Sequence, residues 1–271
     1  QPHAHSEVVS ARKRHHNRNA TITTSSKTAK PFDPTSVPRS TTLHMDYTGD
    51  LSETCLSGTR CFMVSVWGSY IHLEPLTNMR SAQTIAALQR AMKFWRDRRI
   101  AITTLRMDNQ RSADLRKAMA DLGLTLSSVS PYDKSANRAE RAIRTAKNHI
   151  VAVRAGFHRD CPPTYLDKGI KQIELTLNSL HPYEYDPSLS AFEAIHGYPF
   201  DFRRHPIAPV GTKVLTWDAP DHRGSWADHG VPGIYLGPAV EHLRAFEVWV
   251  PSSSAARITN TVWWFLEDRR P

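Results

Sequence analysis

The order of short apolar runs and longer amphipathic segments constrains the fold of this chain more than any other feature. Residues 43–47, 61–67 and 70–76 are apolar or alternating runs of strand length. Gly68 and Ser69 separate the last two runs, which predicts a hairpin between them. The chain therefore opens its folded part with three strands, of which at least two are antiparallel.

Segments with helical periodicity then alternate with further strands. Over residues 78–99 the apolar side chains recur at helical spacing, and polar ones occupy the opposite side. The remaining predicted elements are a strand over 100–108, a helix over 112–122, a strand over 124–129, and helices over 136–155 and 164–180. This order predicts an α/β fold, with a mixed five-stranded sheet flanked by helices.

Beyond Pro206 the pattern contains only strands. Four runs are separated by turn residues, at 211–217, 233–238, 245–250 and 258–265. They predict a small all-β module, a barrel or a sandwich. The predicted organisation is a basic flexible arm over 1–40, an α/β core over 41–196, a linker over 197–209 and the β module over 210–271.

The charge balance indicates a polyanionic partner. The chain has 35 Lys and Arg against 26 Asp and Glu, a formal net charge of +9. Such an excess is typical of proteins that bind nucleic acid, and less often of proteins that bind membrane surfaces. No apolar run approaches the ~18 residues of a membrane span, and the N-terminal segment lacks the apolar core of a signal peptide. The first residue, Gln1, indicates a piece of a longer polypeptide.

The cysteines predict no disulfide framework. There are three, Cys55, Cys61 and Cys161, and no C-x-x-C pair. An odd number without paired spacing fits reduced thiols in the cytosol or nucleus. The histidines of the N-terminal arm lack the paired cysteines of a closed zinc site.

Three acids do not lie on amphipathic surfaces. Asp46 interrupts the first apolar strand, Asp108 follows the fourth, and Glu140 lies near the start of the long helix. A cluster of three carboxylates needs a cation, and hard oxygen ligands select Mg²⁺ or Mn²⁺. Two such ions, ~3.5–4 Å apart, catalyse in-line phosphoryl transfer. For any one acid taken alone, a strand-end turn or a helix cap is the favoured explanation, whereas the three together favour a metal site.

The helix that carries Glu140 has two unlike sides. At 100° per residue its apolar residues fall on one side and its polar residues on the other. We predict that the polar side contacts nucleic-acid phosphates. The alternative is a solvated surface with a Glu140–Arg144 pair. The predicted nucleic-acid contacts are Lys134, Asn137, Arg141, Arg144, Lys147 and Asn148.

Taken together, these segments resemble the integrases of LTR retrotransposons, copia-type in particular, and more broadly the retroviral integrases. The matching segments are LHMDYTG, MDNQ, SPYDKSANRAERAIRT and LSAFEAIHGYP, followed by the strand-rich stretch GVPGIYLGP…FEVWVP…ITNTVWWF. The first three segments contain the three acids. The resemblance extends from about Thr41 to Leu266.

The resemblance implies a ribonuclease-H-like core with Asp46, Asp108 and Glu140 as catalytic metal ligands for Mg²⁺ or Mn²⁺, two ions in all. The implied reaction joins the 3′ ends of element cDNA to target DNA. The implied partners are double-stranded DNA, both element ends and target, and further copies of the chain in a homo-oligomer, with no membrane. The implied location is the nucleus, after a cytoplasmic stage in a particle. The zinc module expected upstream is absent from this sequence.

Departures from the family pattern leave two alternatives open. Gln110 and Arg138 stand where the family has glycines, and the segment between the second and third acids is several residues shorter. Lost glycines stiffen a loop. The alternatives are therefore a catalytically weakened or domesticated DNA-binding protein, and a ribonuclease-H-like nuclease that cuts without joining.

The predictions for the β module concern its aromatic and cationic residues. We predict core positions, rather than base-stacking roles, for its five tryptophans: Trp217, Trp226, Trp249, Trp263 and Trp264. Its cations are candidates for DNA contact or for bridging subunits: Lys213, Arg223, Arg244 and Arg257. In the N-terminal arm, the basic run 12–14 suits nuclear import and phosphate binding equally.

Overall fold

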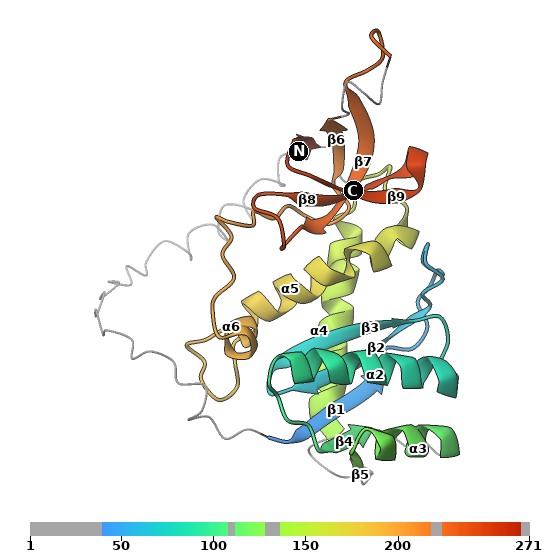
Figure 1. Ribbon diagram of the computed structural model, residues 1–271, viewed down its shortest axis with the longest axis vertical. Coiled ribbons are helices and arrows are strands. Elements are labelled where there is room, and N and C mark those ends of the chain that lie inside the picture. The colour runs from blue at the N-terminus through green and yellow to red at the C-terminus, as the bar shows by residue number, and fades with distance from the viewer. Residues whose placement is uncertain (1–39, 108–111, 128–135, 218–223, 267–271) are drawn as a thin grey trace, which may run out of the picture. The chain divides into compact units, whose positions relative to one another are not determined.

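The computed structural model describes residues 40–107, 112–127, 136–217 and 224–266, with only the backbone of residues 136–138 (Figure 1). The chain divides into two units, residues 1–33 and 34–271, and all described residues belong to the second. Four sites of interest lie outside the described residues: the basic run 12–14, Asp108, Lys134 and Arg223.

A mixed five-stranded sheet forms the first part of the fold. Its strands are β1 (Thr42–Tyr47), β2 (Cys61–Trp67), β3 (Tyr70–Leu76), β4 (Thr104–Met107) and β5 (Thr125–Ser127). They lie in the order β3-β2-β1-β4-β5. The pairs β1–β2 and β2–β3 are antiparallel, whereas β4 and β5 run parallel to β1. The predicted hairpin is present, and Gly68 in its turn has φ +57°, a conformation that favours glycine.

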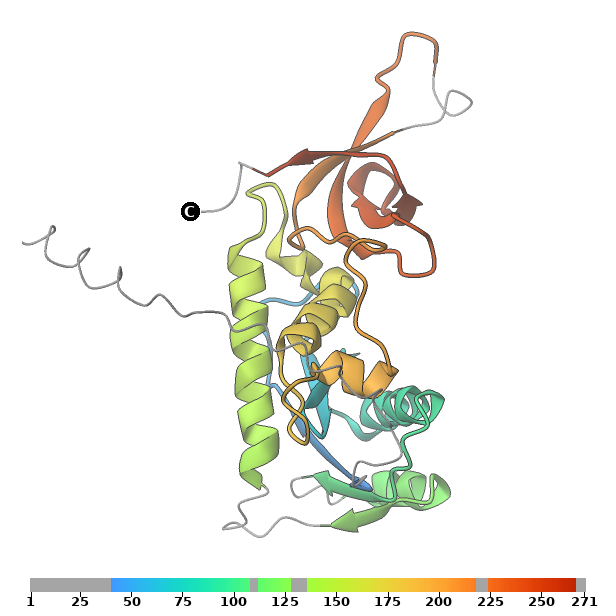
Figure 2. The same ribbon diagram turned by 90° about the vertical axis from the view of Figure 1, so that its left-hand side faces the viewer.

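Helices cover both faces of this sheet. They are α2 (Ser81–Asp97), α3 (Ala113–Asp121), α4 (Ala136–Ala155), α5 (Ile170–Leu180) and α6 (Ala191–His196). Side chains of a strand alternate between faces. Leu43 and Met45 therefore pack with α2 and α3, while β2 residues such as Val64 pack on the other face with α4 and α5. Figures 1 and 2 show α2 and α4 on opposite sides of the sheet.

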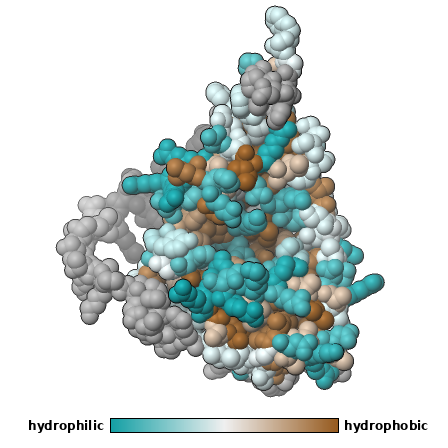
Figure 3. Space-filling view, viewed as in Figure 1, coloured by the Kyte–Doolittle hydropathy of each residue, from teal (hydrophilic) through white to brown (hydrophobic). Residues whose placement is uncertain are grey.

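The apolar stripe predicted for α2 is buried. Leu88, Met92 and Trp95 lie in the core, and Ile85 is half-buried against it. The solvent side of α2 is mostly hydrophilic (Figure 3). An antiparallel hairpin followed by parallel strands with intervening helices is the ribonuclease-H-like arrangement, so the predicted fold class is confirmed.

A second, all-antiparallel sheet forms the C-terminal module. Its strands are β6 (Lys213–Trp217), β7 (Gly230–Pro238), β8 (Phe246–Val250), β9 (Ala255–Thr259) and β10 (Val262–Phe265), in the order β10-β6-β7-β8-β9. Ile234 and Trp249 of this sheet belong to the same hydrophobic cluster as Ile173 of α5. The module thus shares a core with the α/β part. The residue bounds of the four predicted parts stay a prediction.

Two predicted elements are corrected. The helix predicted over 164–180 begins as a 3₁₀ helix, η2 (Pro163–Gly169), and only then continues as α5. Tertiary contacts hold this turn, in which Asp167 accepts a hydrogen bond from the Ser57 N–H at 3.1 Å. The strand predicted over 258–265 is two strands, β9 and β10. They are separated by a turn in which the Thr259 hydroxyl bonds the backbone of Thr261.

No helix in the described ranges is both long and apolar enough to cross a membrane. The three cysteines are buried, and none of them forms a disulfide. Burial raises the pKa of the Cys55 thiol to about 11, and the charge of Asp167 adds to this effect.

The outer edge of β3 is completed by side chains of α5. β3 is an edge strand, and the buried Asn178 side chain accepts from the Ile71 N–H and donates to the Ile71 carbonyl, both at 2.8 Å. Glu174 accepts from the Leu73 N–H at 3.0 Å. Unpaired backbone groups at a buried edge are costly. Here α5 takes the place of a neighbouring strand.

A buried charge network adjoins the same edge. The ring nitrogens of His72 lie 3.0 Å from Glu174 and 3.1 Å from Glu74. Arg90 donates to Glu74 at 2.7 Å, and the Tyr70 hydroxyl donates to Glu174. Burial by itself lowers the pKa of His72, but the charges and hydrogen bonds of the two glutamates outweigh it and raise the pKa to about 9. His72 is therefore an imidazolium at neutral pH.

Replacing Asn178 should destabilise the protein markedly. Asn178→Ala leaves the buried N–H and C=O of Ile71 without partners, so the free energy of unfolding should fall by roughly 2–5 kcal/mol. Asn148→Ala, on the exposed side of α4, should change it by less than about 0.5 kcal/mol. Urea denaturation followed by circular dichroism measures both values. Similar values for the two variants would contradict the role given to the α5 edge contact.

The stability should fall as the pH rises toward 9. The folded pKa of His72 lies above its ordinary value of 6.5. Its contribution is thus complete below pH 6.5 and is lost as the pH passes through about 9, on the order of 3 kcal/mol in total. Urea midpoints between pH 6 and pH 9.5 should show this loss in the wild type and a flatter profile in His72→Gln. His242→Gln, on an exposed loop, should keep the wild-type profile. An unchanged slope in His72→Gln would refute this assignment.

Candidate metal and nucleic-acid site

Asp46 lies near the end of β1 and points toward the sheet face that α4 covers. Its cross-strand partner is Val64, and antiparallel partners share a face. The Asp46 Oδ1 accepts the Tyr47 N–H at 2.7 Å, and Asp46 is half-buried. The next side chain, Tyr47, points to the opposite face, where its hydroxyl lies 3.0 Å from the Thr84 hydroxyl of α2. Alternation along one strand thus directs a carboxylate toward α4 while its neighbour holds the strand against α2.

The parallel strand β4 ends beside Asp46. Met107, the last residue of β4, is in register with Met45. The predicted second acid, Asp108, is the next residue in the sequence and lies outside the described residues. The register therefore places Met107, which precedes Asp108 in the sequence, beside Met45, which precedes Asp46.

Glu140 lies on the helix that packs over this face. Ala142, Ile143 and Ala146 of α4 are buried in one cluster with Val64. Glu140 itself is exposed, near the N-terminal end of α4. Between the described residues Glu140 and Arg144 there is no ion pair, so the helix pair considered as an alternative does not form. Glu140 is thus exposed on the helix that covers the face to which Asp46 points.

The donor types suit a hard divalent cation, but the described residues supply only part of a ligand set. Asp46 and Glu140 offer carboxylate oxygens, which Mg²⁺ and Mn²⁺ prefer. Among the described residues no group of three His, Cys, Asp or Glu side chains is placed to hold a metal ion. The third predicted ligand, Asp108, is not among those residues. The roles of Asp46, Asp108 and Glu140 stay a prediction.

The solvent side of α4 carries exposed cations. Ala142, Ile143, Ala146 and Ile150 are buried, as predicted for the packing side. Four of the predicted nucleic-acid contacts are exposed on the other side: Arg141, Arg144, Lys147 and Asn148. Lys134 and the side chain of Asn137 are outside the described residues. Arg141 and Asn148 are seven residues apart on α4, so at 1.5 Å per residue these groups extend over about 10 Å of the helix.

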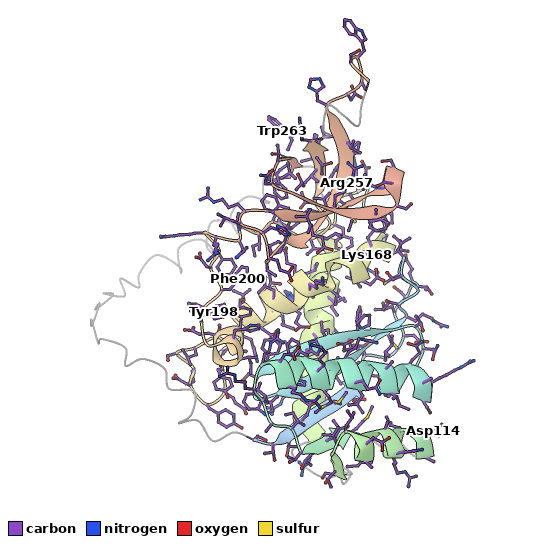
Figure 4. All side chains as sticks on the ribbon, viewed as in Figure 1. Asp114, Lys168, Tyr198, Phe200, Arg257 and Trp263 are labelled. Carbon is purple, nitrogen blue, oxygen red and sulfur yellow. The ribbon has the colours of Figure 1, made fainter. Side chains whose placement is uncertain are left out.

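The prediction that the five tryptophans are core residues is wrong for three of them. Trp249 is buried, and Trp264 packs 5.2 Å from Tyr235 and 5.1 Å from Phe246 between ring centroids. Trp217, Trp226 and Trp263 are 52%, 100% and 71% exposed. Figure 4 shows Trp263 at the margin of the second sheet.

The sequence contained a signal that could have corrected this prediction. Adjacent residues of a strand point to opposite faces. Trp263 and Trp264 are adjacent in β10, so only one of them can enter the core. The sequence pattern does not show which face of the strand is buried.

The cations of the module differ in their environments. Lys213 forms an ion pair with Asp160 at 2.6 Å and lies 5.9 Å from the Phe265 ring centroid. It therefore links β6 to the segment that follows α4. Arg244 is exposed on the loop between β7 and β8, and Arg257 is half-buried in β9. Arg223 lies outside the described residues.

Comparisons with known proteins return structural neighbours only. No protein-family model matches the chain, and no curated protein matches it. Among solved structures, the catalytic core domain of BIV integrase is 18% identical, covering 58% of this chain and 93% of that chain with a TM-score of 0.43. An intasome of simian T-cell lymphotropic virus is 15% identical, covering 82% and 78%, with a TM-score of 0.45. The HTLV-2 integrase catalytic core in complex with magnesium is 18% identical, covering 57% and 94%, with a TM-score of 0.42. Because these sequence identities and TM-scores are low, the fold is assigned from the strand order of the first sheet and not from these neighbours.

Proposed function

We propose that this chain is an integrase, a divalent-metal-dependent polynucleotidyl transferase that joins the 3′ ends of element cDNA to target DNA. One observation carries the proposal. The sheet face to which Asp46 points is covered by α4, the helix that exposes Glu140 and a row of cations on its solvent side. In a ribonuclease-H-like fold, this arrangement suits acids that hold metal ions beside cations that hold a nucleic-acid backbone.

The three acids would share the metal-binding role. Asp46, Asp108 and Glu140 would hold Mg²⁺ or Mn²⁺, two ions in the complete site. Bound there, the ions would activate an attacking oxygen and stabilise the leaving oxygen of a phosphodiester. The fixed strand end at Tyr47 and the packed side of α4 would position Asp46 and Glu140 before substrate binds.

The α4 cations would position the DNA. Arg141, Arg144 and Lys147 would contact phosphates, and Asn148, with Asn137 and Lys134, would add polar contacts near the acids. Phosphate contacts carry no sequence information, so this surface would accept both element ends and target. We further propose a homo-oligomer that holds two element ends. The proposed location is the nucleus, following a cytoplasmic stage in a particle.

Two alternatives share the same fold. Gln110 and Arg138 at the family's glycine positions favour a catalytically weakened or domesticated DNA-binding protein. That protein would keep the α4 cations and lose the joining reaction. A ribonuclease-H-like nuclease would keep the metal-dependent chemistry and release cut ends without joining them.

The joining reaction should depend on both described acids. With Mn²⁺, the protein should resolve a preformed branched DNA, and Asp46→Asn or Glu140→Gln should lower the rate more than about 100-fold, because each replaces a negatively charged carboxylate ligand by a neutral amide. The exposed Glu241→Gln should keep the wild-type rate. Product analysis on gels separates joined from merely cut strands, and titration calorimetry reports Mn²⁺ binding. Equal rates in Glu140→Gln and wild type would refute the assignment. If the protein binds DNA but shows neither joining activity nor Mn²⁺ binding, the domesticated DNA-binding alternative is favoured.

Duplex DNA binding should depend on the α4 cations. Arg144→Gln with Lys147→Gln removes two phosphate contacts, so the slope of log K against log salt should become shallower by about 1.8. Fluorescence anisotropy with a labelled duplex at several salt concentrations measures this slope. The matched control, Lys93→Gln with Arg96→Gln, removes two exposed cations from α2 on the opposite face of the sheet. Equal slope changes in both double variants would show a diffuse charge effect and not a specific surface.

A further inference from the structure

The segment that follows α6 presents exposed aromatic rings on a buried aromatic base. Phe192 is buried, and Phe200 packs against it with ring centroids 5.6 Å apart and planes at 86°. Tyr198 packs against Phe192 at 6.2 Å, and Phe202 against Phe200 at 4.9 Å. Yet Tyr198 is 60% exposed and Phe202 is 47% exposed. Figure 4 shows Tyr198 and Phe200 beside α6. The inner rings thus hold two outer rings in place at the surface.

The backbone around these rings is fixed by local hydrogen bonds. Gly197 ends α6 in the left-handed conformation, with φ +79°. The Asp201 Oδ1 accepts the N–H of Arg203 at 2.9 Å and the N–H of Arg204 at 3.1 Å. The Asp201 carbonyl accepts the N–H of His205. The segment is therefore preorganised, which lowers the entropy cost of binding a ligand.

Three arginines surround the exposed rings. Arg203 and Arg204 are exposed, and the Arg244 N–H donates to the Arg204 carbonyl at 3.2 Å, which brings a third exposed arginine to the segment. Within the described part of the chain, none of these three guanidinium groups forms an ion pair with a carboxylate. We call Tyr198, Phe202, Arg203, Arg204 and Arg244 the linker patch.

The chemistry of the linker patch selects one class of partner. Free guanidinium groups attract a polyanion, and exposed rings offer stacking surfaces for flat groups. Nucleic acid supplies both phosphates and bases. In a duplex each base is stacked on its neighbours, so only unpaired nucleotides present a free base face to a protein ring.

We propose that the linker patch binds unpaired nucleic acid, with bases stacked on Tyr198 and Phe202 and phosphates held by Arg203, Arg204 and Arg244. The patch uses none of the three acids and none of the α4 cations. It therefore goes beyond the proposed joining reaction and requires no metal ion. The segment between α6 and β6 would then have a binding role of its own.

The first test measures the contribution of the rings. Anisotropy of a labelled oligothymidylate, in the presence of EDTA, gives the affinity of the full chain for unpaired DNA. Tyr198→Ala with Phe202→Ala should weaken it at least about tenfold, because each stacked base contributes substantially, and should leave duplex affinity within about twofold. Tyr198→Trp with Phe202→Trp should retain binding. Both pairs should keep the wild-type thermal unfolding midpoint. Unchanged oligothymidylate affinity in the alanine pair overturns the proposal.

The second test separates bases from phosphates. An abasic oligomer of the same length keeps the phosphates and lacks the bases, so the wild type should bind it as weakly as the alanine pair binds oligothymidylate. Arg203→Gln with Arg204→Gln should reduce the salt slope for oligothymidylate by about 1.4, whereas Arg144→Gln with Lys147→Gln should act mainly on duplex binding. Equal wild-type affinity for the abasic oligomer and oligothymidylate overturns the proposal. So does displacement of oligothymidylate by polyglutamate as readily as by unlabelled oligothymidylate, which would indicate an acidic protein partner.

Discussion

The contact between α5 and the open edge of β3 is the interaction on which the rest of the structure depends. Asn178 and Glu174 bond the outward backbone groups of Ile71 and Leu73, as a further strand would. Glu174 also holds the buried His72, and this pairing makes a charged histidine tolerable inside the protein because the opposite charges compensate its desolvation. Through Ile173, the same helix carries the apolar surface on which the second sheet packs. The helix α5 thus completes the edge of the first sheet and packs against the second sheet.

The long helix α4 performs two tasks because its two sides differ in chemistry. Its alanines and isoleucines pack on the sheet, which sets the position of the helix relative to β1. Its cations and Glu140 remain in solvent on the other side. Small packing residues bring the helix close to the sheet, and the proposed metal site would lie between the start of the helix and β1. The packing side therefore determines where the charged side can act.

Much of the fold could be predicted from local pattern, and the errors have physical causes. The first three strands follow from short apolar or alternating runs, and α4 follows from a period-3.6 pattern. The helix predicted over 164–180 is partly 3₁₀, and the contact of this turn with Ser57, far away in the sequence, is not visible in the local pattern. The exposure of Trp263 could not be predicted from its hydrophobicity, since that depends on which face of β10 the neighbouring strands cover. The candidate site could be predicted as three acids in order, while the register of Met45 with Met107 became visible only in the folded sheet.

The sequence by itself determined the succession of elements, the two-sided character of α4, the excess of positive charge and the three candidate acids, because these depend on residue type and spacing alone. The tertiary structure decided which faces are covered, that α5 completes the edge of β3, and that Lys213 pairs with Asp160. It also decided that Tyr198 and Phe202 stand exposed among arginines. Burial and pairing are relations between segments distant in the chain. Local pattern shows which side of an element is apolar, but it does not show which distant segment covers that side or pairs with it.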